Sequence, residues 1–183
     1  RVPRREGTPQ GQPPIQALMD AQRALSLVRS HAADWKIRPD RIGILGFSAG
    51  GHLVAWASTH GEKRSYEPVD DADRASCAPD FAIAIYPGGI LKRGTTEMAE
   101  EIPISARTPP TFIAVAADDR GSAEGSVRYF LALRQAGVPS ALHVFESGGH
   151  GFGMRPSEKA YAGWPKRCEE WMRDRGLLKK AAD

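Results

Sequence analysis

One serine lies in a sequence context that favours nucleophilic chemistry. Residues 46–50 read Gly-Phe-Ser-Ala-Gly and match the pattern G-x-S-x-G, with Ser48 at the centre. An apolar stretch, Ile42 to Phe47, runs directly into this motif, and a sequence typical of a helix follows it. A strand, a tight turn and a helix in this order are the setting of a nucleophile elbow. The alternative is a tight turn with a helix-capping serine.

The turn itself predicts where a negative charge would be stabilised. Gly46 and Gly50 would remove side chains that otherwise collide across the turn. The hydroxyl of Ser48 would then project at the end of the strand. The backbone N–H of Ala49, at the N-terminus of the following helix, would face an oxyanion that develops on a substrate.

A serine hydroxyl is a weak nucleophile and needs a general base, which His150 is placed to provide. This histidine follows an apolar strand and stands among the glycines of Gly148-Gly-His-Gly-Phe-Gly153. A flexible loop at a strand end can bring a base to a serine; an ordinary loop histidine is the alternative. The other histidines read as helix-surface, helix or strand residues without this role: His31, His52, His60 and His143.

An acid that orients the base is expected after a strand between the serine and the histidine. Asp118 and Asp119 stand there, directly after the stretch Thr111–Ala117. One of the two carboxylates would accept a hydrogen bond from His150 and hold its tautomer. The other would cap the next helix or remain solvated. Sequence position alone assigns neither role.

The elements around these residues alternate between strands and helices. The first fourteen residues read as an extended lead-in, and a helical pattern that starts at Ile15 is expected to end at Pro39. Residues 61–79 are expected to be a loop, and the charged stretch 90–110 a solvated face. The remaining expected strands and helices are, in order, strand 42–47, helix 49–60, strand 81–86, strand 111–117, a helix around 127–133, strand 142–145 and a helix around 161–172.

This alternation predicts an α/β fold with a doubly wound, mostly parallel sheet flanked by helices. The length of 183 residues favours a single domain over residues 1–183. Ligand sites in such folds lie at the carboxyl ends of the strands. Ser48, Asp119 and His150 all follow predicted strands, so the sheet would bring them to one edge.

Composition excludes several classes of protein. Hydrophobic residues make up 41% and charged residues 26%, which disfavours a disordered chain, and no apolar run is long enough to span a membrane. The net charge of +3 is scattered, with its densest clusters at Arg4-Arg5 and Lys179-Lys180, so no nucleic-acid partner is expected. Cys77 and Cys168 are either buried thiols or a disulfide.

No cofactor is predicted. The sequence has no H-E-x-x-H, paired-cysteine, G-K-[ST] or G-x-G-x-x-G pattern, so we expect neither a metal nor an organic cofactor. The first residues carry charge without a following apolar stretch, so no targeting segment is recognised in the chain and the compartment stays open. Oligomeric state is also left open.

Four stretches resemble bacterial acetylxylan esterase-like α/β-hydrolases, a group that overlaps the dienelactone hydrolase-like or prolyl-oligopeptidase-like family. They are the elbow Arg41-Ile-Gly-Ile-Leu-Gly-Phe-Ser-Ala-Gly-Gly-His-Leu53 and the segments Pro109-Pro-Thr-Phe112, Ala116-Ala-Asp-Asp119 and Leu133 to Gly153. The chain order serine, aspartate, histidine is also theirs. The resemblance covers nearly the whole chain.

This resemblance implies roles for individual residues. Ser48 would be the nucleophile, His150 the base and Asp119 the acid, with Asp119 favoured over Asp118 by alignment from the Thr-Phe start of the strand. The implied substrate is a short acyl ester, acetyl on a carbohydrate such as xylan. The alternatives are a peptidase or dienelactone-type hydrolase using the same triad, and a non-catalytic binding protein with a hydrolase fold.

The family's chain starts earlier than Arg1, with strands and a glycine-rich loop that supplies a second oxyanion donor. Arg1-Val-Pro3 is similar to the end of the family's fourth strand, so the N-terminal strands of the fold are expected to be missing. Only the amide of Ala49 would then line the oxyanion hole, and loss of one donor typically costs ~10²–10³ in rate. We therefore expect the isolated chain to be poorly soluble and weakly active.

Overall fold

Four parallel strands form the sheet. The computed structural model describes residues 15–178, and its strands lie side by side in chain order: β1 (Gly43–Phe47), β2 (Phe81–Ile85), β3 (Thr111–Ala116) and β4 (Ser140–Phe145). Parallel neighbours require crossover connections. Helices lie in the connections from β1 to β2 and from β3 to β4, whereas residues 86–110 join β2 to β3 without a helix. The parallel sheet of the predicted α/β fold is therefore confirmed.

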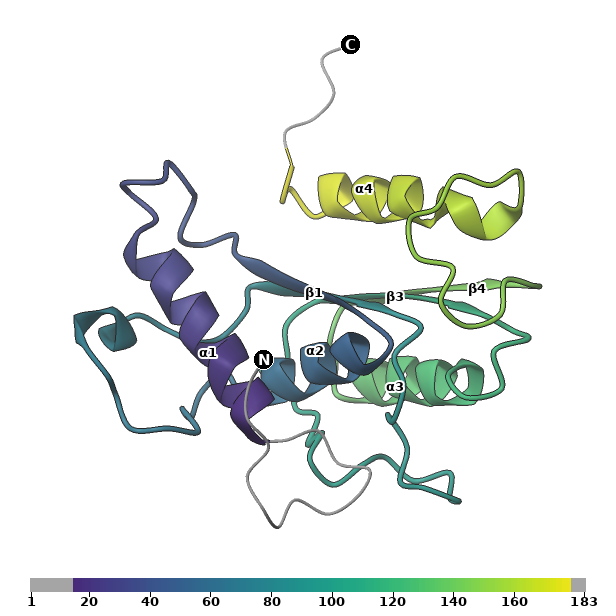
Figure 1. The fold of residues 1–183 in the computed structure, drawn as a ribbon, viewed down its shortest axis with the longest axis horizontal. Coiled ribbons are helices and arrows are strands. Elements are labelled where there is room, and N and C mark those ends of the chain that lie inside the picture. Colours follow the sequence, from purple (N-terminus) through teal and green to yellow (C-terminus); the bar gives the residue numbers. More distant parts are fainter. Residues whose placement is uncertain (1–14, 179–183) are drawn as a thin grey trace.

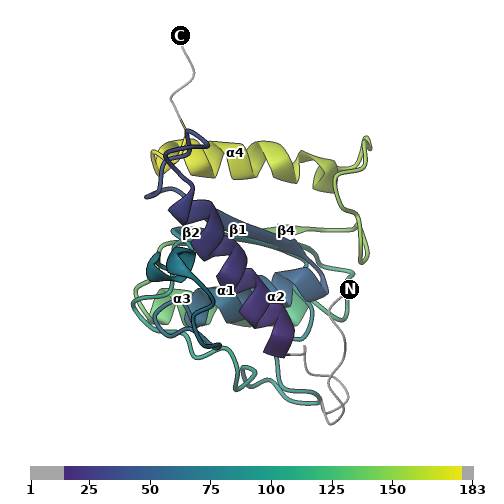
Figure 2. The same ribbon diagram turned by 60° about the vertical axis from the view of Figure 1, so that its left-hand side comes forward.

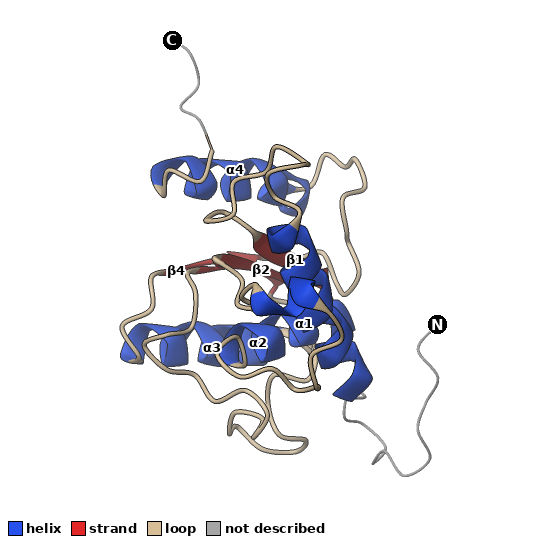
Figure 3. Ribbon diagram, turned by 90° about the vertical axis from the view of Figure 1, so that its left-hand side faces the viewer, coloured by secondary structure: helices blue, strands red, loops and turns tan. Residues whose placement is uncertain are grey.

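Helices cover both faces of the sheet (Figure 1). One face carries α2 (Ala49–Thr59) and α3 (Ala123–Gln135), and α1 (Ile15–Ser30) packs beside α2. The opposite face carries α4 (Trp164–Asp174), which Figure 2 and Figure 3 show on its own above the strands. Two short 3₁₀ helices, η1 (Asp71–Arg74) and η2 (Ala160–Gly163), complete the described elements.

The central strands are apolar because both of their faces are covered. Every residue of β3 is buried, and four of the five residues of β2 are buried. In the outer strands Leu45 of β1 is 47% exposed and Val144 of β4 is 48% exposed. Continuous apolar runs without alternation are typical of strands in the middle of a parallel sheet.

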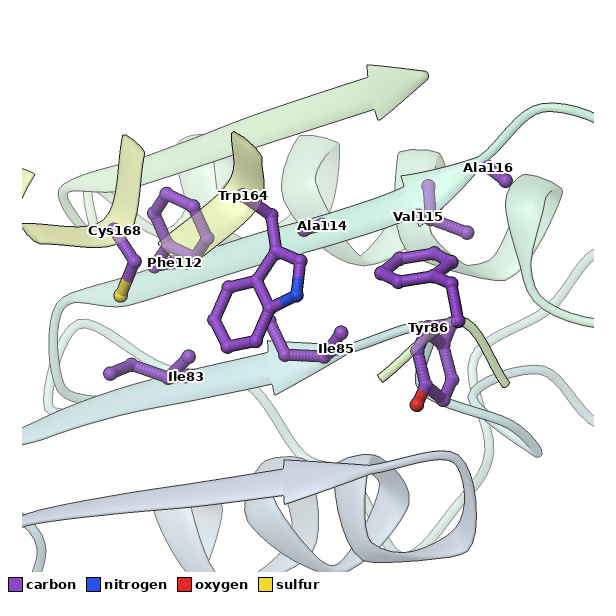
Figure 4. Close-up of a cluster of buried hydrophobic side chains, with 10 residues drawn as sticks. Ile83, Ile85, Tyr86, Phe112, Ala114, Val115, Ala116, Trp164 and Cys168 are labelled. Carbon is purple, nitrogen blue, oxygen red and sulfur yellow. The ribbon is translucent and has the colours of Figure 1, made fainter. Parts of the chain in front are cut away.

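One hydrophobic core lies between α4 and the sheet. Trp164 and Cys168 of α4 pack over Ile85 of β2 and Phe112 of β3 (Figure 4). Tyr86, which directly follows β2, belongs to the same cluster. The cluster therefore extends to the carboxyl end of β2, where Tyr86 lies.

The first helix is shorter than its periodicity predicts. It ends at Ser30, nine residues before Pro39, and residues 31–36 form turns. The N–H of His31 still donates to the carbonyl of Leu27 at 3.1 Å, but the N–H of Ala32 donates to the carbonyl of Arg29, three residues back, at 3.3 Å. The regular α-helical pattern therefore ends here in a tighter turn. The expected lead-in, the similarity at Arg1-Val-Pro3 and both basic clusters lie outside the described residues.

The stretch 90–110 is not simply a solvated face. Its glutamates 97 and 100 are exposed, but Ile90, Ala99 and Ile102 are buried and pack with Tyr129 and Leu133 of α3. These apolar residues are isolated among acidic ones, so the sequence shows no periodic pattern that would indicate their burial. The prediction for this stretch is thus wrong for its apolar positions.

The two cysteines are buried and free, so the disulfide alternative is wrong. Burial raises the pKa of the Cys168 thiol to about 11. Within residues 15–178, no helix combines the length and the apolar character that crossing a membrane requires.

Candidate active site

Ser48 lies in a strained turn between β1 and α2. Its backbone φ is 55°, a left-handed value that side-chain-bearing residues rarely adopt. The backbone N–H of Ser48 donates to the carbonyl of Ile85 at 3.0 Å, which ties the turn to the end of β2. The hydroxyl makes no capping hydrogen bond to α2, so the helix-cap alternative is wrong.

The glycines around the serine have different reasons to be glycine. A Cβ on Gly46 would lie 2.2 Å from the carbonyl oxygen of Gly50, which is a collision. A Cβ on Gly50 would meet nothing within 4 Å, so the expected clash at this position is wrong. The close approach instead occurs at Gly51, where a Cβ would lie 2.8 Å from the Cα of Pro87. The turn is thus packed against the loop that follows β2.

Three side chains predicted from the sequence are brought into one hydrogen-bonded series. Ser48 Oγ lies 2.7 Å from His150 Nε2, and His150 Nδ1 lies 2.7 Å from Asp119 Oδ2. The Asp119 side chain is 4% exposed, whereas the His150 side chain is 46% exposed. The series therefore runs from a buried carboxylate to a hydroxyl at the surface, and it can take a proton from that hydroxyl.

The structure separates the two neighbouring aspartates by their partners. Asp119 faces the imidazole and also accepts from the N–H of Gly121 at 3.2 Å. Asp118 accepts from the N–H groups of Gly148 and Gly149 at 3.3 Å and 2.8 Å, and these bonds lower the pKa of its carboxyl. Asp118 caps no helix with these bonds and is exposed, as one of the two expected alternatives had it, but it also supports the loop that carries His150.

Tyr86 is part of this site, and sequence reasoning missed it. Its ring contacts the His150 ring edge to face at a centroid distance of 5.0 Å, and its backbone φ is 37°. The Tyr86 hydroxyl accepts from the N–H of Gly153 at 3.1 Å, and Trp164 Nε1 donates to the carbonyl of Gly153 at 2.7 Å. Burial raises the pKa of Tyr86. Its place directly after a predicted strand was the available signal.

Ser122 was also missed. Its hydroxyl lies 3.5 Å from His150 Nδ1, at the far limit of a hydrogen bond. The residue stands three positions after Asp119, at the start of α3. The Ser122 hydroxyl therefore lies next to the contact between His150 Nδ1 and Asp119.

The other histidines lie away from the serine hydroxyl. His52 is buried and its Nδ1 lies 2.9 Å from the carbonyl oxygen of Gly89, with Glu101 3.3 Å from its Nε2. His143 of β4 packs on Phe112, and burial lowers its pKa. The imidazoles of His31 and His60 lie within hydrogen-bonding distance of carbonyls one helical turn back, those of Leu27 and Trp56. These contacts hold the local fold.

The N–H of Ala49 is the first of α2, and the first N–H groups of a helix have no partner inside the helix. It adjoins Ser48 at the positive end of the helix dipole, a position suited to an oxyanion. No group of three or more histidine, cysteine, aspartate or glutamate side chains in the described part of the chain is arranged to hold a metal ion.

Comparisons with known proteins found a matching family model and related esterases. Residues 10–86 match the family described as BD-FAE. An acetylxylan esterase of Xylanibacter ruminicola is 29% identical over 86% of this chain and 34% of its own length. The chain thus spans about a third of that relative.

In comparisons with solved structures, the chain covers a larger share of the other protein's length. The acetyl ester-xyloside bifunctional hydrolase of Caldicellulosiruptor lactoaceticus is 34% identical over 88% of this chain and 66% of its own, with a TM-score of 0.78. A candidate carboxylesterase of Lactobacillus plantarum is 31% identical over 86% of this chain and 68% of its own, with a TM-score of 0.66. The chain therefore belongs to the α/β-hydrolase superfamily and is similar to its acetylxylan esterase members.

Proposed function

We propose that the chain carries the active site of a serine ester hydrolase that removes short acyl groups, acetyl above all, from carbohydrate. The observation that carries this proposal is the series Ser48–His150–Asp119, with two contacts of 2.7 Å. A strained turn presents the hydroxyl at the carboxyl edge of the sheet, where ligands of such folds bind.

In the proposed reaction His150 Nε2 takes the proton of the Ser48 hydroxyl as the oxygen attacks the ester carbonyl. Asp119 holds the proton on Nδ1 and stabilises the imidazolium that forms. The N–H of Ala49 donates to the oxyanion. The imidazolium then protonates the departing alcohol, and an acyl-enzyme remains. Water, deprotonated by His150, releases the acid and restores the serine.

The substrate class rests on relatives. The proteins named acetylxylan esterase and acetyl ester-xyloside hydrolase support an acetylated sugar as the substrate. The chain covers 34% of the length of the first protein and 66% of the length of the second. No observation favours an amide or a carbon–carbon bond as the scissile bond over the ester.

The first test is hydrolysis of p-nitrophenyl acetate and butyrate by the purified chain beside Ser48→Ala. We expect acetate to be the better substrate and the variant to lose the enzymatic rate, by a factor on the order of 10⁶ or down to background. A fluorophosphonate probe provides a second readout, because it should label the wild-type chain and leave the variant unlabelled.

Two outcomes contradict the proposal. Equal labelling and equal rates in both proteins would exclude a nucleophilic role for Ser48 and favour a non-catalytic binding protein. Faster cleavage of a matched p-nitroanilide than of the ester would indicate a peptidase.

A further inference from the structure

A cavity lies beside the proposed catalytic series. It has a volume of about 270 Å³ and is formed by residues 89–95, which follow β2, and by residues of the segment 120–125, which follows β3. Ser48, Asp119 and His150 do not line it. It opens at the same carboxyl edge of the sheet, between the loops of two neighbouring strands.

Short contacts join this cavity to the series. The N–H of Gly88, next to the lining residue Gly89, donates to the carbonyl of Ser48 at 3.1 Å. Gly121, which lines the cavity, donates its N–H to Asp119 Oδ1 at 3.2 Å. The cavity wall is thus hydrogen-bonded to the turn of Ser48 and to the carboxylate of Asp119.

The charge of the lining is positive and partly uncompensated. Two charged lining residues have partners outside the cavity lining. Lys92 lies 3.3 Å from Glu100, and Glu124 lies 2.8 Å from Arg128. Arg93 and Arg120 also line the cavity and are exposed, and no carboxylate of residues 15–178 forms an ion pair with either. Arg93 and Arg120 are therefore two cations without an ion-pair partner in the described chain, in a lining whose one carboxylate, Glu124, is paired with Arg128.

The shape of the cavity favours a small, oxygen-rich group. Four of its eleven lining residues are glycines, namely Gly89, Gly94, Gly121 and Gly125, so backbone rather than side chains forms much of the wall. The volume of about 270 Å³ lies just below the range of ~300–1,000 Å³ that is typical of small-molecule sites. A cavity of this size suits one sugar ring rather than a chain of sugars. A guanidinium pairs with a carboxylate through two parallel hydrogen bonds.

We propose that this cavity binds the carboxylate of a uronic acid unit on the alcohol side of the ester, so that the chain prefers acetylated acidic sugars. The proposal rests on the proposed esterase function, because the acetyl group must lie at Ser48 while the carboxylate lies between Arg93 and Arg120. Acetylated neutral sugars would bind without this contact and react more slowly.

The kinetic test compares two substrates that differ only in the carboxylate: acetylated methyl glucuronoside and acetylated methyl glucoside. We expect the full chain to have a kcat/KM about 10-fold higher for the uronoside. The double variant Arg93→Gln/Arg120→Gln should remove that preference and leave the glucoside rate within about twofold. The preference should also shrink as sodium chloride rises from ~0.05 M to ~0.5 M, because both arginines are exposed.

Arg38→Gln is the matched control. Arg38 is an exposed arginine that pairs with Asp40 just before β1, at the opposite edge of the sheet. The variant changes the net charge of the protein by the same amount per residue and should keep the preference. Equal loss in Arg38→Gln would assign the effect to overall charge and overturn the proposal.

A binding arm separates this proposal from the esterase proposal. Unacetylated methyl glucuronoside is titrated by NMR into Ser48→Ala and into Ser48→Ala with both arginine substitutions. Arginine-dependent binding without hydrolysis of any ester would retain the cavity site and overturn the esterase function. Hydrolysis without preference or arginine-dependent binding would overturn the cavity site alone, and tighter binding of inorganic phosphate would overturn the carboxylate class.

Discussion

Asp73 and Asp119 are both buried carboxylates, yet their partners differ in kind. Asp73 accepts hydrogen bonds from the Tyr66 hydroxyl at 2.6 Å and from the N–H of Val69 at 2.9 Å. The guanidinium groups of Arg23 and Arg64 lie 3.0 Å and 3.4 Å from its oxygens. Arginine is charged at every physiological pH, so Asp73 has permanent cationic partners.

Within residues 15–178, Asp119 has no arginine or lysine as a counter-ion. Its partners are a backbone N–H and His150, an imidazole that is 46% exposed and belongs to a glycine-rich loop. A histidine gains and loses its proton near neutral pH. A buried carboxylate beside a group that can become a cation is suited to catalysis, whereas one already neutralised by two arginines is suited to holding chain segments together.

Asp119→Asn should have the largest effect on activity. The asparagine amide offers N–H donors toward Nδ1, which favours the wrong histidine tautomer, and loss of the carboxylate leaves the imidazolium unsupported. We expect kcat for p-nitrophenyl acetate to fall by about 10⁴. Steady-state kinetics on a chain of unchanged circular dichroism checks this. A loss below about tenfold would contradict the role proposed for Asp119.

Asp73→Asn should affect stability rather than catalysis. It removes the charge that two arginines face, and we expect Tm to fall by roughly 10 °C while kcat at low temperature stays within twofold. The control is Asp71→Asn, because Asp71 is an exposed neighbour that pairs only with Arg74 among the described contacts. A Tm loss equal to that of the control would remove the contrast between the two regions.

The pH dependence sharpens the same test. Burial opposes ionisation of Asp73, but hydrogen bonds from Tyr66, Val69 and Arg23 outweigh it and lower the pKa to about 2. A carboxyl whose pKa is lowered by folding stabilises the protein above its ordinary value of 3.8 and loses this contribution as pH falls toward 2. Thermal melts between pH 5 and pH 2 should therefore fall less steeply for Asp73→Asn than for the wild type.

Asp118→Asn should have the smallest of these effects. One amide N–H₂ would face the N–H groups of Gly148 and Gly149, so the His150 loop would lose one of its two supports at this end. We expect kcat to fall about fivefold, with KM within twofold and Tm nearly unchanged, since Asp118 is exposed. A parallel fall in Tm would assign Asp118 to the fold rather than to the position of His150.

Local patterns predicted most elements well. The predicted strands 42–47, 81–86, 111–117 and 142–145 match the observed strands to within two residues, because a buried parallel strand is a short apolar run between turn residues. The end of α1 was predicted wrongly because the N–H of Ala32 bonds three residues back rather than four, a change that the apolar periodicity does not show. The buried Asp73 was not recognised, since it lies in a polar stretch that reads as a loop.

The sequence by itself determined the strand–turn–helix around Ser48 and the glycine-rich loop around His150, because both depend on neighbours along the chain. The family resemblance favoured Asp119, but the positions along the chain did not decide which carboxylate meets the imidazole, and the tertiary structure did. Asp118 and Asp119 are chemically identical and adjacent, and the choice depends on where a loop about thirty residues later returns to them. Ser48 and His150 are 102 positions apart, so only the parallel sheet brings them into contact.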